Sequence, residues 1–416
     1  MTRAFRLLMY GLILASAAAQ FALVPVMPVY ARQLGLSGLQ QGLLLGATGL
    51  ATLAVSVPAG TLSDRFGARR ITLAAGLLMA AATLAQALAG SFPALLAARL
   101  AFGAGYGVLW TAGLCWLAAA AGGPRALGGS VASSGVGGVV GPAVSGALTE
   151  HFGLAVPLLA AAGGFAVITA GLAALRVPAG TAESGPVAPA GLRAAGRDRG
   201  VIGAAAAVVT AGLSTGACAL LVPAQLHLTG ASSGQIGLVF AAAGILFAAG
   251  SALTTAAGRR AVTLPVICAG MLVLTAALSL GVLSTASLAL IVMLCVATAA
   301  RSVLWTVSYP LAATAAERRG IGLGAAVGLL NGIWAATAVL GPLGAGLAAE
   351  HLGGRAAFGL TEAACAAALA VTVAAAGRGW LPARRPTGPG WLAARRAAGH
   401  GPGPDPVPAS RGTAVP

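Results

Sequence analysis

The chain has 416 residues, of which 58% are hydrophobic and only 8% are charged. A soluble protein of this length needs a polar surface that so few charged side chains cannot cover, so this composition predicts a membrane protein. The net charge of +16 comes from arginines in short loops between apolar runs, which argues against a nucleic-acid-binding surface. The five cysteines lie far apart inside apolar stretches without CxxC or histidine spacing, so we expect no disulfide, metal or cofactor.

Apolar runs long enough to cross a bilayer, which takes about 20 residues per helix, occur twelve times. They lie near 7–30, 39–62, 70–90, 93–119, 127–149, 154–175, 201–226, 234–257, 261–283, 286–312, 320–349 and 355–377. The first run could be mistaken for a cleaved signal peptide, but its apolar stretch is too long for one, and we expect it to be retained. No motif of a membrane enzyme accompanies the runs, so we expect no enzymatic activity.

Polar segments divide the chain into parts. They predict an N-terminal six-helix half (1–176), a cytoplasmic linker (177–200), a C-terminal six-helix half (201–377) and a disordered cytoplasmic tail (378–416).

The orientation in the membrane follows from the arginine bias of the loops. With the N-terminus inside, almost all loop arginines lie in inside segments, whereas only Arg32 and Arg355 lie in outside segments. The bias therefore predicts that both termini are cytoplasmic. We expect a multi-pass protein of a bacterial plasma membrane that works as a monomer.

The two halves repeat one another. GPAVSGALTEHFG from Gly141 matches GPLGAGLAAEHLGG from Gly341, and LVPVMPVY from Leu23 matches LVPAQLHL from Leu221. Six helices per repeat is an even number, so the repeats have the same orientation and are related by an axis along the membrane normal. Two such halves suit alternating access, in which they rock about a central cavity.

The segment GTLSDRFGARR, between the second and third runs, is the strongest local motif. It resembles the loop motif of the major facilitator superfamily at Gly60, Asp64, Arg65 and Gly67, with Arg69 among the basic residues that follow. The resemblance implies an all-α membrane protein with the twelve-helix fold of that family. It also implies that Asp64 meets the N-terminal end of the helix near 320–349 and latches the halves with the inner side sealed. The alternative interpretation is a basic loop that only sets topology.

Two further patterns resemble those of the family. Arg99 in ARLAFGAGYG matches its R-x-x-x-G-x-G pattern, which implies a role in proton coupling or hydrogen bonding; the alternative is an arginine that snorkels to the outer headgroups. Gly141, Pro142 and Gly146 resemble the pattern of the antiporter branch, which implies close helix packing that limits leak; the alternative is generic small-residue packing.

Candidate cavity residues are the polar and aromatic side chains on helices that line the site in this family, although each alone could also serve packing. Arg301, the looser counterpart of Arg99, lies deeper in its run, and we expect it to face the cavity. The full set is Gln20, Tyr106, Trp110, Gln225, Arg301, Trp305, Asn331 and Trp334.

These features predict a secondary transporter that exports small apolar or amphipathic compounds in exchange for protons. Its partners would be a small-molecule substrate, protons and lipid, without nucleic acid. Many exporters of the family place an acid in the first helix, where this chain has only Gln20. The alternative is therefore an uptake or facilitative carrier for a polar or anionic solute, bound by Arg301 and Arg99.

Overall fold

A computed structural model describes residues 2–121, 124–175, 177, 198–318 and 323–377. Most of the predicted linker and the predicted tail lie outside these described residues. The described residues up to Ala375 belong to one compact unit. It is all-helical and contains twelve helical stretches that are long and apolar enough to span a membrane, which confirms the predicted fold class.

The described residues of the first half form seven α-helices, because one span is interrupted. They are α1 (Thr2–Leu34), α2 (Gly38–Phe66), α3 (Ala68–Leu88), α4 (Phe92–Val108), α5 (Leu114–Ala121), α6 (Pro124–Phe152) and α7 (Ala155–Ala174). A π-helical turn, η1 (Leu109–Gly113), joins α4 to α5, so these three elements form one span.

The second half contains α9 (Arg199–Leu228), α10 (Ser233–Ala257), the 3₁₀ turn η2 (Gly258–Arg260), α11 (Leu264–Leu283), α12 (Ser287–Arg318), α13 (Leu323–Leu352) and α14 (Gly354–Gly377). Several helices are longer than the apolar segments predicted from the sequence, because they continue through the polar residues at the membrane boundary.

The repeat is visible in how equivalent helices begin. Ser37 caps α2 and Ser232 caps α10, and each forms a capping box with the glutamine three residues later, Gln40 or Gln235. Such a box satisfies amide groups that would otherwise lack partners at the helix start. The two halves therefore share local structure as well as sequence.

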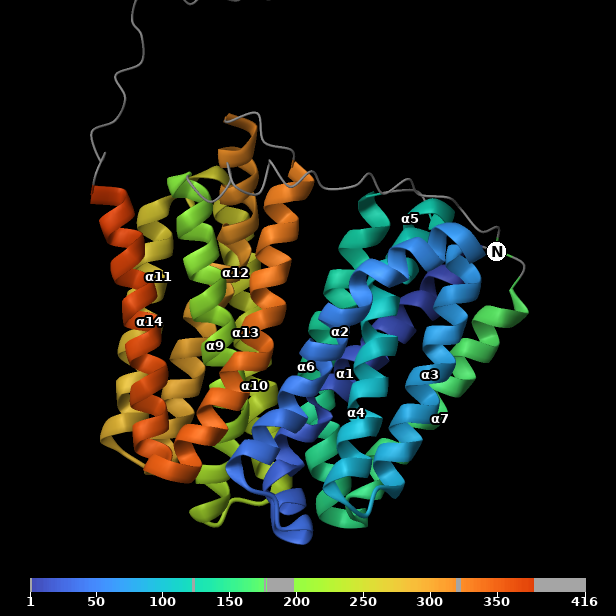
Figure 1. Cartoon of the computed structure of the whole chain (residues 1–416), viewed down its shortest axis with the longest axis horizontal. Coiled ribbons are helices and arrows are strands. Elements are labelled where there is room, and N and C mark those ends of the chain that lie inside the picture. The colour runs from blue at the N-terminus through green and yellow to red at the C-terminus, as the bar shows by residue number, and fades with distance from the viewer. Residues whose placement is uncertain (1, 122–123, 176, 178–197, 319–322, 378–416) are drawn as a thin grey trace, which may run out of the picture. The chain divides into compact units, whose positions relative to one another are not determined.

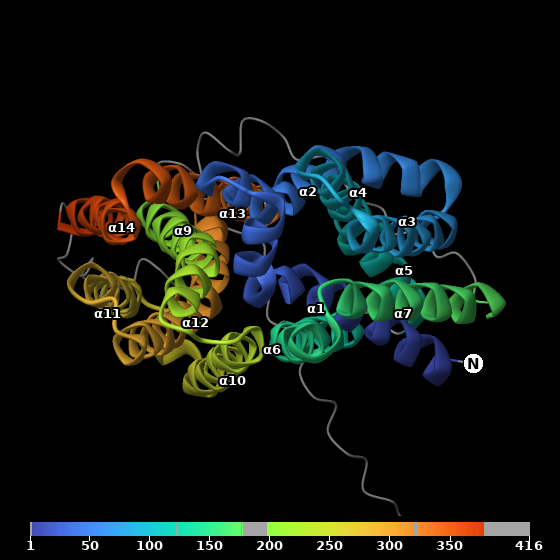
Figure 2. The ribbon, with the colours of Figure 1, turned by 90° about the horizontal axis from the view of Figure 1, so that it is seen from below.

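Two helices pack against both halves. In the first half α6 packs on α1 and reaches across to α10, and in the second half α13 packs on α9 and reaches across to α2. Figure 2 shows α6 between α1 and α10 and α13 between α9 and α2. The contact between the halves thus consists mainly of two equivalent helix pairs.

Glycine allows these helices to approach closely. A Cβ built on Gly141 would lie 2.7 Å from the Cα of Ala18 in α1, and one built on Gly341 would lie 2.8 Å from the carbonyl oxygen of Leu213 in α9. Both approaches are too short for any side chain. Small residues matter in lipid because the association of helices depends on van der Waals packing rather than on the hydrophobic effect.

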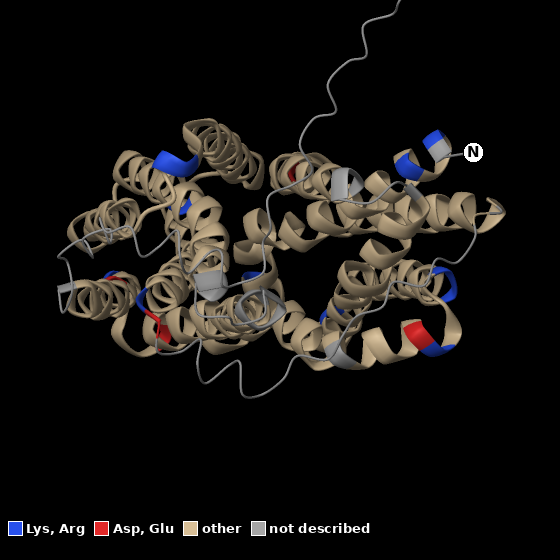
Figure 3. Ribbon diagram, turned by 90° about the horizontal axis from the view of Figure 1, so that it is seen from above, with Lys and Arg blue, Asp and Glu red and all other residues tan. Residues whose placement is uncertain are grey.

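The side of the unit where α1 begins is called the arginine-rich side here, because Arg3, Arg6, Arg69, Arg70 and Arg259 lie at helix ends there. Figure 3 views this side, with its arginines in blue. The opposite side is called the arginine-poor side.

The halves touch near the arginine-poor side. Glycines of α2 from Gly38 to Gly49 contact α13, whereas Thr52, one turn further on, donates a hydrogen bond to Gly103 of its own half (3.1 Å). Beyond it, Leu62 and Phe66 are exposed. In Figure 1 the two halves converge at the bottom, on the arginine-poor side, and diverge toward the top. The structure therefore has its inter-half contact closed on the arginine-poor side.

We predict that Gly141→Ala destabilises the protein by roughly 1–3 kcal/mol, the usual range for inserting a methyl group into a well-packed site. The new Cβ would collide with the backbone of Ala18. Thermal unfolding in detergent measures the effect. Gly135→Ala, on the same helix with nothing within 4 Å of its Cβ, is the matched control and should leave the unfolding temperature unchanged. Equal unfolding temperatures for both variants would contradict this account.

Candidate substrate-binding site

Arg99 joins α4 to α1 inside the first half. Its Nη2 donates to the carbonyl oxygen of Gln20 (2.7 Å) and to the Gln20 side chain (3.2 Å), and its Nη1 donates to the carbonyl of Ala19 (3.4 Å). The guanidinium also lies over the ring of Phe102, 5.3 Å from the centroid. Only 1% of the Arg99 side chain is exposed, which does not fit an arginine that snorkels to the headgroups. Gln20 and Arg99 are therefore brought together as a hydrogen-bonded pair.

Aromatic side chains continue along the same span. The rings of Tyr106 and Trp110 lie 6.1 Å apart, and both side chains are half-buried. Trp110 belongs to the π-helical turn η1. Such turns are rare in helices and occur frequently at functional sites, because they change the direction in which side chains point. This pair is the aromatic part of the candidate site in the first half.

Arg301 occupies a comparable place in the second half but has fewer partners. Its Nη2 donates to the hydroxyl of Thr298 (2.7 Å) on the same helix, α12. Its Nη1 is buried and has no hydrogen-bond partner among the residues that the structure describes. The Cys218 thiol of α9 lies close enough to interact with its charge. A buried guanidinium with a free donor is able to bind an oxygen of a ligand.

The repeat shows how the surroundings of Arg301 differ from those of Arg99. Leu23 of α1 corresponds to Leu221 of α9, and the residues three positions earlier are Gln20 and Cys218. Each arginine therefore lies beside the same position of the first helix of its half. Glutamine offers Arg99 a side-chain oxygen, whereas a thiol is a weak acceptor. The exchange of glutamine for cysteine thus gives Arg301 a weaker acceptor at this position than Arg99 has.

Three aromatic rings gather between α12 and α13. Trp305 lies edge-on to Trp334, with 4.7 Å between centroids, and 5.5 Å from Tyr309. The Tyr309 hydroxyl donates to Oδ1 of Asn331 (2.8 Å), and Asn331 is exposed. Three of the predicted residues (Trp305, Asn331 and Trp334) are therefore brought into one cluster, one helical turn from Arg301. Tyr309 belongs to the cluster as well.

Gln225 lies elsewhere. Its side chain packs against Gly354, where α14 begins, because a Cβ on that glycine would meet the Gln225 amide. No contact connects Gln225 to the aromatic cluster within the described part of the chain. Its assignment to the cavity stays a prediction.

The loop between α2 and α3 shows where its predicted residues lie. Gly67 has a φ of 87°, which favours glycine and allows the tight turn. Arg69 donates to the carbonyls of Ala173 (2.8 Å) and Leu175 (3.2 Å), where its charge favours the C-terminal pole of α7.

The remaining residues of this loop have fewer contacts. A Cβ placed on Gly60 would have no neighbouring atom within 4 Å, and Arg65 lies over the ring of Phe66 at 5.2 Å. Asp64 is exposed. The segment where its expected partner helix begins, 319–322, lies outside the described residues, so the latch at Asp64 stays a prediction.

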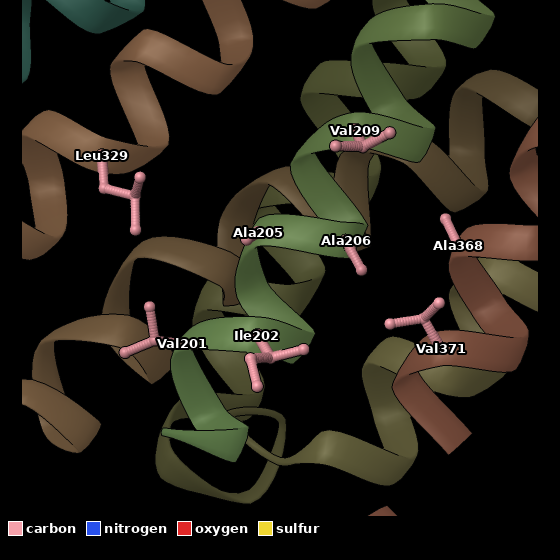
Figure 4. A pocket seen from close by; sticks show the side chains of 8 residues that line it. All are labelled: Val201, Ile202, Ala205, Ala206, Val209, Leu329, Ala368 and Val371. Atoms are coloured by element: carbon pink, nitrogen blue, oxygen red, sulfur yellow. The ribbon is translucent and has the colours of Figure 1, made fainter. Parts of the chain in front are cut away.

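A cavity of about 360 Å³ lies between α9, α13 and α14 (Figure 4). All of its lining residues are apolar, among them Val201, Leu329 and Val371, and none belongs to the predicted site. With no polar group to orient a solute, this cavity is a poor candidate for the substrate site.

Comparison with known families agrees with the twelve-span fold. The family model described as Major Facilitator Superfamily matches residues 9–326. The chain belongs to this superfamily. Its members are membrane transporters for small molecules rather than enzymes, and this protein is therefore a secondary transporter.

Two curated proteins are similar in sequence to part of this chain. The uncharacterized MFS-type transporter YuxJ of Bacillus subtilis is 36% identical over 140 residues, which is 32% of this chain and 35% of that protein. The quinolone resistance protein NorA of Staphylococcus aureus is 33% identical over 86 residues, 21% of this chain and 22% of NorA. The matches thus span about a third and about a fifth of the relatives' own lengths.

Solved structures share the fold over nearly the whole chain. A bacterial homolog of the human lysosomal transporter Spinster, inward-facing and occupied, has a TM-score of 0.74 at 16% identity, covering 89% of this chain and 96% of that one. A mutant of the nucleoside transporter NupG has a TM-score of 0.70 at 13% identity, covering 89% and 99%. At these identities the likeness establishes the fold of the superfamily alone.

We predict that the two arginines differ in their effect on stability. Arg99→Ala should lower the free energy of unfolding by roughly 2–4 kcal/mol, because it removes several buried hydrogen bonds to α1 and leaves a cavity. Arg301→Ala should cost less than about 1 kcal/mol, because it removes one bond together with an unpaired buried donor. Thermal unfolding of both variants in the same detergent tests this. A larger loss for Arg301→Ala would contradict the assignment of their partners.

Proposed function

We propose that this transporter exports small apolar or amphipathic compounds by alternating access, driven by the proton gradient. The observation that carries the proposal is the character of the candidate site. Aromatic rings dominate it, with Tyr106 and Trp110 in one half and Trp305 and Trp334 in the other. Aromatic and weakly polar linings suit apolar solutes, since few polar groups must be satisfied by the ligand.

The absence of carboxylates from the candidate site supports the same class of substrate. Among the residues whose side chains the structure describes, the acids lie at helix ends or on α14: Asp64, Glu150, Asp198, Glu350 and Glu362. None of them interacts with the residues of the aromatic cluster in the described ranges. The partial similarity to the resistance protein NorA is further support for export.

The proposed orientation places the arginine-rich side in the cytoplasm, in accordance with the positive-inside rule. Both termini would then be cytoplasmic, and the protein would work as a monomer in a bacterial plasma membrane. In this orientation the closed contact between the halves faces outward. The described conformation would accept its substrate from the cytoplasm or the inner leaflet.

We assign Arg301 to the substrate cavity because its Nη1 donor is buried and unpaired among the described residues. A substrate carbonyl or ether oxygen would satisfy this donor, whereas the rings of the cluster would hold the apolar part. Asn331, which is exposed beside Tyr309, offers a second polar contact. Asp64, Arg65, Gly60 and Gly67 would serve the conformational change instead.

The test is accumulation of a fluorescent amphipathic dye in inside-out vesicles, with and without an imposed proton gradient. We expect gradient-driven accumulation that falls at least about tenfold in Arg301→Ala, the factor for losing one hydrogen bond to a charged group. Arg355→Ala, an exposed arginine at the start of α14, is the control and should transport normally. No accumulation by folded, inserted protein would contradict proton-coupled export.

A second function is favoured by the same unpaired donor. A buried cation without a carboxylate partner also suits an anionic solute, and the protein would then be an uptake or facilitative carrier. Saturable inward flux of a carboxylated substrate would support this function. We expect that flux to be lost in Arg301→Ala and partly retained in Arg301→Lys, since lysine keeps the charge. Equal flux in the two variants would exclude charge recognition by Arg301.

A further inference from the structure

Two glutamates occupy equivalent places in the repeat, near the arginine-poor ends of α6 and α13. In the first half, Oε2 of Glu150 accepts a hydrogen bond from the hydroxyl of Ser232 (2.8 Å) and from the amide of Gly234 (3.0 Å). Both partners belong to the start of α10, in the second half. Glu150 therefore connects the two halves.

Glu350 makes the corresponding connection in the opposite direction. Its Oε2 accepts from the amide of Leu39 (2.9 Å), and the Ser37 side chain and the Gly38 backbone lie close to the carboxylate. These partners form the start of α2, in the first half. Each half thus sends one carboxylate to the other half.

The two contacts match position by position. Ser37 and Ser232 are the N-caps of α2 and α10, and Leu39 and Gly234 each lie two residues further on. Both glutamates therefore bind the same amide of equivalent helices. Amide groups at a helix start lack partners within the helix, and the positive helix pole attracts a carboxylate.

Next to each carboxylate, the backbones of the two halves pack closely, and this packing also requires the arginine-poor side to be closed. A Cβ on Gly146 would meet the carbonyl of Ser233, and one on Gly346 would meet the carbonyl of Gly38. One turn deeper, the carbonyl of Pro142 touches α10 and that of Pro342 touches α2 in the same manner. Any rocking that opens this side must separate these surfaces and break both carboxylate contacts.

We infer that Glu150 and Glu350 form two symmetry-related latches that hold the arginine-poor side closed. They form when the transporter opens toward the arginine-rich side, and they release together when it opens the other way. This inference rests on the alternating access that the proposed function requires, but it does not depend on the substrate or the proton. It assigns a role to the two equivalent glutamates of the repeat, which the transport site does not use.

The latches also predict an imbalance between the two sides. At its other end, α2 carries Asp64, which is predicted to meet the start of α13 when the arginine-rich side closes. The equivalent end of α10, at Gly258–Arg260, has no acid. Two carboxylates would therefore close one side and one carboxylate the other. Removal of Glu150 and Glu350 should shift the resting population toward opening on the arginine-poor side.

The experiment measures the distance between spin labels on the arginine-poor side in full-length protein without substrate. Labels are attached at Ser91→Cys, in the loop before α4, and Ala286→Cys, in the loop before α12, after the five native cysteines are replaced. Both positions are exposed and lie in different halves. Glu150→Ala, Glu350→Ala and the double variant are compared with their parent by pulsed electron paramagnetic resonance.

We expect each single variant to raise the ratio of long to short distances about threefold, the effect of losing one exposed cap. The double variant should raise it about tenfold, because both latches break in one motion. Glu362→Gln is the matched control: this carboxylate accepts from Ser279 (2.5 Å) within one half, so the distances should not change. An unchanged distance distribution in the folded double variant would overturn the inference.

If the double alanine variant does not fold, Glu150→Gln with Glu350→Gln replaces it. The amide oxygen of glutamine still accepts a hydrogen bond but lacks the charge, so we expect a smaller shift in the same direction. No shift in this folded pair would also overturn the inference. If the label distance shifts but no gradient-driven dye transport is found, the proposed export is contradicted and the inference about the two latches still holds.

Discussion

The approach of glycine-lined helix faces is the constraint on which the rest of this structure depends. Between helices in lipid the hydrophobic effect is absent, so association relies on close contact between backbones. Gly141 brings α6 against α1, and Gly146 brings the same helix against α10. Gly341 and Gly346 do the same for α13. Because α6 and α13 each serve both halves, one pair of helices determines both the interior of each half and the surface on which the halves meet.

The two halves share this framework but differ at the centre. Arg99 is held by three oxygens of α1, which ties α4 to α1 within the first half. Arg301 has Cys218 where Arg99 has Gln20, and one of its donors is unpaired among the described residues. The two repeats thus keep the same fold but differ in the hydrogen-bond acceptor beside the arginine, so the two arginines can have different roles. We expect one arginine to stabilise the structure and propose that the other binds the substrate.

Contacts between a carboxylate and the N-terminus of a helix would stabilise the two end states of the motion between the halves. Such contacts are short-ranged and directional, so they favour the fully closed arrangement of a side over intermediate ones. On the arginine-poor side these contacts are present in the structure, at Glu150 and Glu350. On the arginine-rich side the predicted contact at Asp64 would take their place. A carboxylate would then join α2 to α13 on the arginine-poor side in one state and on the arginine-rich side in the other.

The number of spans, the repeat and the superfamily could be predicted from the sequence, because apolar length, arginine bias and loop motifs are properties of short segments of the chain. The sequence also identified Trp305, Asn331 and Trp334, which the fold brings together. It did not show that Arg99 is hydrogen-bonded to Gln20, or that Glu150 and Glu350 bind the opposite half rather than solvent. These partners follow from the fold, because a hydrogen bond between residues far apart in sequence depends on which helices lie side by side and at what depth.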